Sequence, residues 1–298
     1  MTLRERVARV TAWWEGTRLA RALARFSRAA GGVLTGGIAY AFLFSLAAAL
    51  TLGFTGFVRL LGGNPDLRAD LVTTIDGALP GLLETGDGTG LLDPEDLVLS
   101  GTGWWGLVAA GVLLWSATVA MAALRTAVRA VAGETEAMGA VGGKARELAG
   151  FLALGVAVLL AAALGLALTT LTGPVADALG WPDAGAVVGR VVAVVVTLVL
   201  DAGVFVLVVK ILAGLDVPGR ALWSAAALAA VAFGAVRLLG AAVVAGSATT
   251  NPLFASVAVL ATLLVWLNLL SRIVLTAVAW MVEGAPQEPA EPVEPSGD

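Results

Sequence analysis

Three ionisable side chains that could do chemistry lie inside long apolar stretches of the sequence: Asp201, Arg237 and Arg272. An unpaired charge at the centre of a bilayer costs on the order of 2.5–3.5 kcal/mol or more. Each of the three must therefore face protein, water or another charge, and together they predict a polar site within the membrane. Tyr40 and Ser45, on another apolar stretch, are weaker candidates for the same site.

The depth of two of these charges predicts that they meet. Asp201 lies nine residues before Lys210, and Arg272 lies ten residues before Val282, where their apolar stretches end. At 1.5 Å per helical residue, each lies roughly 14 Å below the same membrane face. We therefore expect Asp201 and Arg272 to pair or to share a polar cavity.

Arg237 is predicted to lie nearer the opposite face of the membrane. Its long side chain could reach the interface or meet Asp177 or Asp183. Three roles stay open for the intramembrane charges. They could form a buried ion pair that fixes helix register, line a substrate or ion pathway, or contact lipid head groups.

Conventional catalysis finds little support, because the chain has no cysteine and no histidine. This excludes disulfides and thiolate zinc sites, and it removes the commonest general base. The carboxylates at 93–96 match no calcium-loop spacing, and no lysine follows the glycine-rich stretch at 86–90. We expect no catalytic residues, no cofactor and no metal, and hence no enzyme.

The composition shows what surrounds these residues. The chain is 59% hydrophobic and 13% charged, whereas soluble domains are about 25% charged. A water-soluble fold of 298 residues could not bury so much apolar surface. The predicted fold class is therefore all-α, a polytopic integral membrane bundle.

Apolar runs longer than about 20 residues mark the membrane spans. They divide the chain into a basic amphipathic helix at 1–28, a transmembrane domain at 29–282 and a disordered acidic tail at 283–298. The outer loop at 62–101 is expected to hold a short surface helix, because leucine or isoleucine recurs every four residues within it. Six spans are predicted, at 31–61, 102–131, 148–173, 187–210, 221–246 and 253–282.

Arginine and lysine counts in the connections predict the orientation. Seven arginines precede the first span, and basic residues recur in the connections at 132–147 and 211–220. The alternate connections, at 62–101, 174–186 and 247–252, hold a single basic residue between them. Because basic loops stay in the cytoplasm, both termini are predicted to be cytoplasmic.

The N-terminal segment carries arginines at helical spacing, namely Arg18, Arg21, Arg25 and Arg28. A basic amphipathic helix beside a membrane span normally contacts the anionic lipids of the inner leaflet. Membrane lipids are therefore the expected partners of these arginines. A nucleic-acid partner is not expected, because the adjoining span already accounts for the charge.

Small residues recur every four positions on two of the predicted spans. Small side chains at this spacing let helix backbones approach closely within a membrane. Close packing inside the chain is the simplest interpretation, and a homo-oligomer face or a sliding surface is the alternative. The two stripes are Gly37, Ala41, Ser45, Ala49 and Gly53, and Ala161, Gly165, Thr169 and Gly173.

Three apolar stretches stand out by their residue patterns: IAYAFLFSL at 38–46, LWSA at 114–117 leading to Leu124-Arg125, and LVWLNLLS at 264–271. Together they resemble the YihY/BrkB family of bacterial inner-membrane proteins. The chain departs from the family at two places. Ala47-Ala48 follow the first-span serine where a proline is usual, and Ala277-Val278-Ala279 stand where Gly-Ala-Glu is usual.

The resemblance implies a six-helix, permease-like protein of the bacterial cytoplasmic membrane with an undetermined substrate. Some relatives are labelled virulence factors, and the family was once misnamed ribonuclease BN. A ribonuclease is not expected here, because neither histidine nor a compact carboxylate cluster is present for metal-assisted cleavage. The leading hypothesis is a transporter or lipid-handling protein. The alternative is a non-transporting envelope scaffold that acts through its N-terminal arginines and acidic tail.

Overall fold

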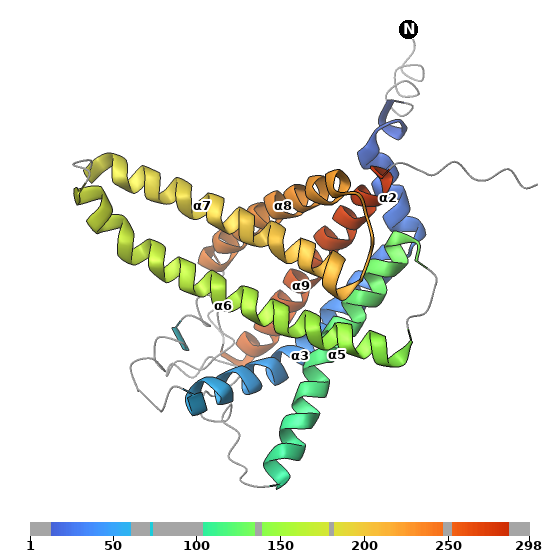
Figure 1. Cartoon of the computed structure of the whole chain (residues 1–298), viewed down its shortest axis with the longest axis horizontal. Helices are drawn as coiled ribbons and strands as arrows, with labels where there is room; N and C mark the ends of the chain where they lie inside the picture. Colours follow the sequence, from blue (N-terminus) through green and yellow to red (C-terminus); the bar gives the residue numbers. More distant parts are fainter. Residues whose placement is uncertain are drawn as a thin grey trace, which may run out of the picture.

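Every element in the described part of the chain is a helix, and the prediction of an all-α polytopic membrane protein is confirmed. The computed structural model describes residues 13–60, 72–73, 104–134, 139–178, 182–246 and 252–285. Nearly all of the predicted outer loop, including its surface helix, and the tail beyond 285 lie outside these ranges. In order, the elements are α2 (Arg18–Arg28), α3 (Gly31–Leu60), α5 (Trp104–Ala132), α6 (Ala140–Ala178), α7 (Pro182–Leu207), the π-helix η1 (Val208–Leu212), α8 (Gly219–Gly246) and α9 (Pro252–Glu283), as Figure 1 shows.

The helix lengths agree with a chain that crosses a membrane five or six times. Five described helices are long and apolar enough to span, and a sixth span results if α2 and the start of α3 count as one bent segment. The largest departure from the predicted spans is in α6, which begins at Ala140 instead of 148. Its first turns are charged, so hydropathy alone did not assign them to the helix.

A sharp elbow separates α2 from α3, whose axes differ in direction by 68°. The hydroxyl of Thr17 starts α2 by accepting the backbone N–H of Ala20 at 3.2 Å. Ala30 then adopts a left-handed conformation with φ of 53°, which turns the chain. Gly31 follows because a side chain there would collide with the ring of Phe26. This elbow positions the groove described below.

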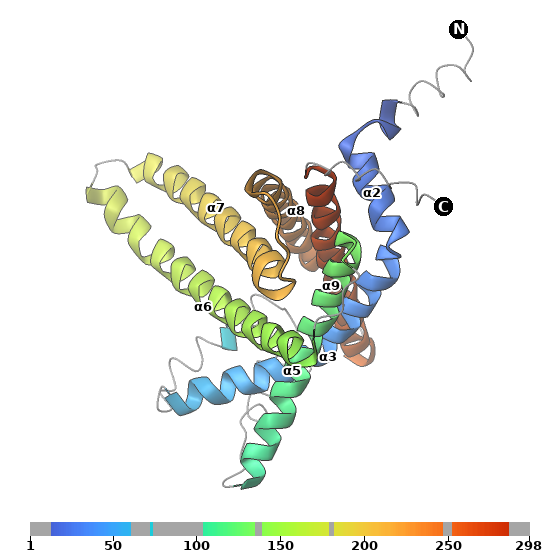
Figure 2. The same ribbon diagram turned by 45° about the vertical axis from the view of Figure 1, so that its right-hand side comes forward.

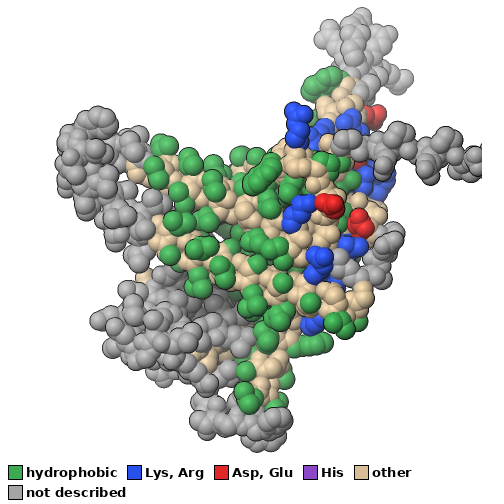
Figure 3. All heavy atoms as spheres, viewed as in Figure 1, with side chains coloured by type: hydrophobic (Ala, Val, Ile, Leu, Met, Phe, Trp, Pro, Cys, Tyr) green, Lys and Arg blue, Asp and Glu red, His purple; other side chains and the backbone are tan. Residues whose placement is uncertain are grey.

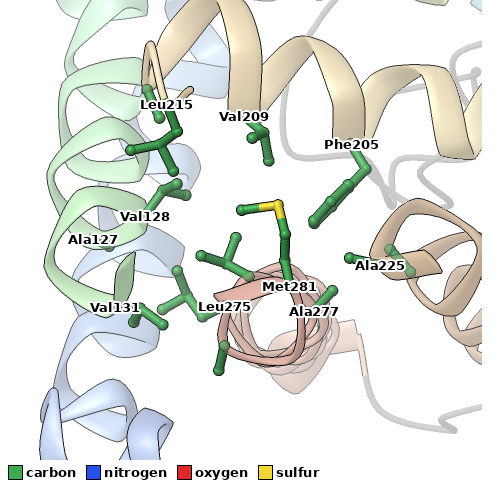
Figure 4. Close-up of a cluster of buried hydrophobic side chains, with 14 of the residues drawn as sticks. Ala127, Val128, Val131, Phe205, Val209, Leu215, Ala225, Leu275, Ala277 and Met281 are labelled. Carbon is green, nitrogen blue, oxygen red and sulfur yellow. The ribbon is translucent and has the colours of Figure 1, made fainter. Parts of the chain in front are cut away.

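A core of buried hydrophobic residues lies where the C-terminal half of α9 meets α5, η1 and α8 (Figure 4). Leu275 and Met281 of α9 are fully buried there, and Phe205, Val209 and Val128 point toward them from α7, η1 and α5. Within a membrane, such side chains stabilise the fold mainly by close van der Waals packing, because lipid tails are as apolar as the side chains themselves. This core holds together the helix ends that carry the charged residues.

The charged side chains gather at one end of the molecule, seen at the upper right of Figure 3, while the rest of that face is largely apolar. Ion pairs and hydrogen bonds join α2 to the end of α9, α5 to the first turns of α6, and α5 to Ala213 just after η1. Segments that the arginine and lysine counts assigned to the same side of the membrane therefore lie together. The apolar remainder is the surface expected to face hydrocarbon.

The α6 and α7 helices pair along their length, and their connected ends extend away from the other helices (Figures 1 and 2). Only 6% of the α6 span and 11% of the α7 span are buried, so lipid or another protein must cover them. Ala161 and Gly165 of the small-residue stripe on α6 are exposed, whereas Ser45 of the stripe on α3 packs against α5. The two stripes therefore have different surroundings.

Candidate functional site

An ion pair joins α7 to α8 within their apolar lengths. The Arg237 guanidinium donates from Nη2 to both carboxylate oxygens of Asp201, at 3.1 and 3.3 Å. The Asp201 side chain is 16% exposed and that of Arg237 is 54% exposed. The predicted pairing of Asp201 with Arg272 is therefore wrong, and Arg237 has Asp201 as a partner. Equal depth says nothing about lateral position, and α7 packs mainly on α6 and α8.

Removing one charge of the Asp201–Arg237 pair is expected to destabilise the protein more than removing both charges. Asp201→Asn leaves the charge of Arg237 unbalanced in an apolar setting, at a cost of up to about 3 kcal/mol. Arg237→Gln likewise leaves the carboxylate of Asp201 without a balancing charge. The double variant removes both charges and should recover part of the loss. Thermal unfolding in detergent measures all three, and additive losses would contradict a direct interaction.

Arg272 lies in a groove at the elbow between α2 and α3. This elbow groove encloses about 480 Å³. The Arg272 guanidinium stacks over the ring of Phe26, with 5.6 Å between its central carbon and the ring centre. No carboxylate in the described part of the chain forms an ion pair with Arg272. The groove is lined by Leu23, Phe26, Ser27, Ala30, Gly32, Val33 and Arg272.

Three arginines of α2 bind the C-terminal end of α9, and we name this arrangement the α2–α9 clamp. Arg18 donates to the backbone carbonyl of Trp280 at 2.8 and 3.2 Å, and its guanidinium stacks on the Trp280 ring at 4.3 Å. Arg25 pairs with Glu283 at 2.7 Å, and Arg21 approaches the same carboxylate at 3.6 Å. The negative end of the α9 helix dipole adds to the attraction.

The clamp changes the expected role of the N-terminal arginines. Arg18, Arg21 and Arg25 were predicted to contact inner-leaflet lipids, and the structure gives each an intramolecular partner as well. Burial lowers the pKa of the Arg18 guanidinium, and the charge of Arg21 acts in the same direction, while Glu283 opposes both. An arginine nevertheless stays protonated at any physiological pH. Arg28 is exposed and donates to the carbonyl of Ala24 at 3.4 Å.

A second polar cluster, which the sequence reasoning missed, joins α5 to the first turns of α6. Glu147 is 4% exposed and pairs with Arg125 at 2.8 Å and with Lys144 at 3.0 Å. The Lys144 ammonium also donates to the Thr118 hydroxyl at 3.0 Å and lies 3.9 Å from the ring centre of Trp115. The signal was the spacing of Lys144 and Glu147, three apart, which places both on one helix face.

The two weaker candidates do not join the charged residues. Tyr40 is 62% exposed and packs against Phe44, with 4.5 Å between the ring centres. Ser45 is buried and donates to the backbone carbonyl of Ser116 at 2.7 Å. Of the five predicted residues, the structure pairs Asp201 with Arg237 and gives Arg272, Tyr40 and Ser45 other neighbours. Among the described residues, no three carboxylates come close enough to hold a metal ion.

The chain matches the family model described as virulence factor BrkB over residues 22–296. Comparison with curated proteins and with solved structures found no match. The matched region runs from α2 through α9, so it includes the ion pair, the elbow groove and the second polar cluster. This agrees with the resemblance of the three apolar stretches. The chain is a member of the BrkB family of multi-pass membrane proteins.

Proposed function

We propose that this BrkB-family protein handles lipids in the bacterial cytoplasmic membrane, and that a lipid enters it at the elbow groove. The observation that carries the proposal is the combination of a charged side chain with apolar walls in one groove. Arg272 supplies the charge, and Phe26 and Val33 supply apolar surface. A lipid is a molecule with this same division between a polar head and apolar chains.

The position of the groove also favours a lipid over a solute. Val33 is 77% exposed and Leu23 is 39% exposed, so the groove opens on the outside of the bundle. A molecule can therefore reach it sideways from the bilayer, without a passage between the helices. Exposed apolar residues continue along α3 to Tyr40 and Phe44. They offer a surface on which acyl chains could lie.

A non-transporting envelope scaffold is the second candidate, and the closed ion pairs favour it. Asp201 and Arg237 balance each other, as do Arg125 and Glu147, which is what a purely structural bundle needs. Against it, three of the N-terminal arginines that were to recruit partners, Arg18, Arg21 and Arg25, are engaged by α9. The groove also has no purpose in a scaffold. A lipid-exchange assay separates the two candidates.

The experiment is lipid exchange between leaflets in vesicles that contain the purified protein and a fluorescent lipid. The wild-type protein should accelerate exchange over protein-free vesicles. Gly32→Leu should abolish the acceleration, because Gly32 lines the groove and a Cβ atom added there meets no atom within 4 Å. Leucine can therefore fill the groove without displacing the backbone, and it is a better helix former than glycine.

The matched control is Gly155→Leu, on α6. Gly155 is exposed, is not part of the groove lining and also has open space around its Cβ position. This variant should exchange lipids as fast as the wild type. Equal rates for the two leucine variants, or a wild-type rate no faster than that of empty vesicles, would reject lipid handling at this groove.

A further inference from the structure

We infer that the elbow groove selects lipids by charge, with Arg272 binding the phosphate of an anionic phospholipid head group. The inference rests on the proposed function and names its substrate class. A guanidinium always carries its charge and presents N–H donors in a planar fork that matches phosphate oxygens. The Phe26 ring makes a cation–π contact with the guanidinium, with 5.6 Å between the ring centre and its central carbon, and this contact gives none of the N–H donors an oxygen acceptor.

The level of Arg272 along α9 fits the head-group region. Arg272 lies eleven residues before Glu283, the last residue of α9, which is roughly 16 Å along the helix. Over this stretch α2 packs beside α9. Arg18 contacts Trp280 at one end of the stretch, and Phe26 contacts Arg272 at the other. A helix with four arginines in eleven residues does not lie in hydrocarbon. The boundary between charged and apolar surface therefore lies near the elbow, at the level of Arg272.

The lining of the groove favours a net negative head group over a zwitterionic one. Within the described residues, no aspartate or glutamate lines the groove, so nothing there would receive the cation of a choline head group. That cation would also lie close to the charge of Arg272. An anionic head group instead balances a charge that no carboxylate of the described chain balances. The Ser27 hydroxyl lines the same groove and is a further donor for a head-group oxygen.

The exposed face of α3 provides the path for the acyl chains. Val33, Tyr40 and Phe44 are 77%, 62% and 59% exposed, and their spacing places them on one side of the helix. Gly36 and Gly37 lie between them and add no side chain that would obstruct this face. A lipid whose phosphate binds Arg272 therefore has its acyl chains beside the apolar surface of α3. A free phosphate ion would leave this surface and the apolar groove walls unused.

Native mass spectrometry of the full chain, with phosphatidylglycerol or phosphatidylcholine added to the detergent, tests this inference. The wild-type protein should retain phosphatidylglycerol about tenfold more strongly, because phosphatidylcholine brings a second cation close to the charge of Arg272. Arg272→Gln should lose this preference, and Arg272→Lys should keep part of it. The control is Arg220→Gln, which removes an exposed charge outside the groove and should retain the full preference.

Three outcomes would overturn the inference. One is an unchanged preference in Arg272→Gln, and another is displacement of the lipid by millimolar inorganic phosphate, which would indicate a site for free phosphate. The third is equal retention of the two lipids by the wild type. If this third result accompanies lipid exchange that Gly32→Leu abolishes, selection by charge fails while lipid handling stands. If exchange is also absent, both fail.

Discussion

Replacing Glu147 with glutamine is expected to lower the free energy of unfolding by about 3–5 kcal/mol, the usual effect of removing one partner from a buried ion pair. Glu147 is 4% exposed and balances both Arg125 and Lys144 where α6 crosses α5. Glutamine keeps the shape of the side chain but leaves two cations facing each other. The loss is measured by unfolding the protein in a series of detergent mixtures of increasing denaturing strength.

Asp216→Asn provides the matched control for this variant. Asp216 pairs with Lys210 at 3.1 Å, a distance close to those around Glu147, but its side chain is fully exposed. An exposed pair of this kind contributes about 0–1 kcal/mol, so this variant should unfold almost as the wild type does. If the two amide variants lose similar stability, burial does not strengthen the Glu147 cluster and our assignment of its role fails.

Glu283→Gln is expected to release α2 from α9 and to expose α2 to protease. The Glu283 carboxylate forms ion pairs with Arg25 at 2.7 Å and with Arg21 at 3.6 Å. Hydrogen bonds to charged groups contribute about 1.5–3 kcal/mol, so the local opening of α2 should become roughly 10- to 100-fold more frequent. Limited trypsin digestion, with mass spectrometry of peptides that end at Arg21 and Arg25, measures this opening.

The control for the clamp is Glu134→Gln. Glu134 approaches Arg129 at 3.6 Å just beyond the end of α5, and its side chain is 49% exposed. Cleavage of α2 should stay at the wild-type rate in this variant. Equal cleavage in the two variants would show that Glu283 does not hold α2. Because α2 supplies Leu23, Phe26 and Ser27 to the elbow groove, losing the clamp should also reduce lipid exchange.

The fold class followed from the sequence because lipid imposes a strong and local constraint. An apolar run must be long enough to cross the hydrocarbon, and its backbone must be helical to satisfy its own hydrogen bonds. The starts of α7 and α9 also carry a local signal, since Pro182 and Pro252 are their first residues. The α6 helix begins before the predicted span because Lys144, Arg146 and Glu147 belong to the helix but not to its apolar length.

The site was predicted less well, because partners depend on which helices are neighbours. Hydropathy places Asp201 and Arg272 at similar depths, yet it does not show that α8 lies beside α7 and brings Arg237 to Asp201. Nor does a basic amphipathic pattern reveal whether a helix lies on lipid or packs on protein. The α2 helix packs on α9, and this packing both forms the clamp and creates the groove around Arg272.

The most direct test of the account is a structure of the protein determined by electron cryomicroscopy in nanodiscs that contain phosphatidylglycerol. We predict density for a head-group phosphate within hydrogen-bonding distance of the Arg272 guanidinium, continuous with acyl-chain density along Val33 and Tyr40 of α3. An elbow groove without lipid density, with Arg272 paired to a carboxylate of the chain itself, would contradict the account.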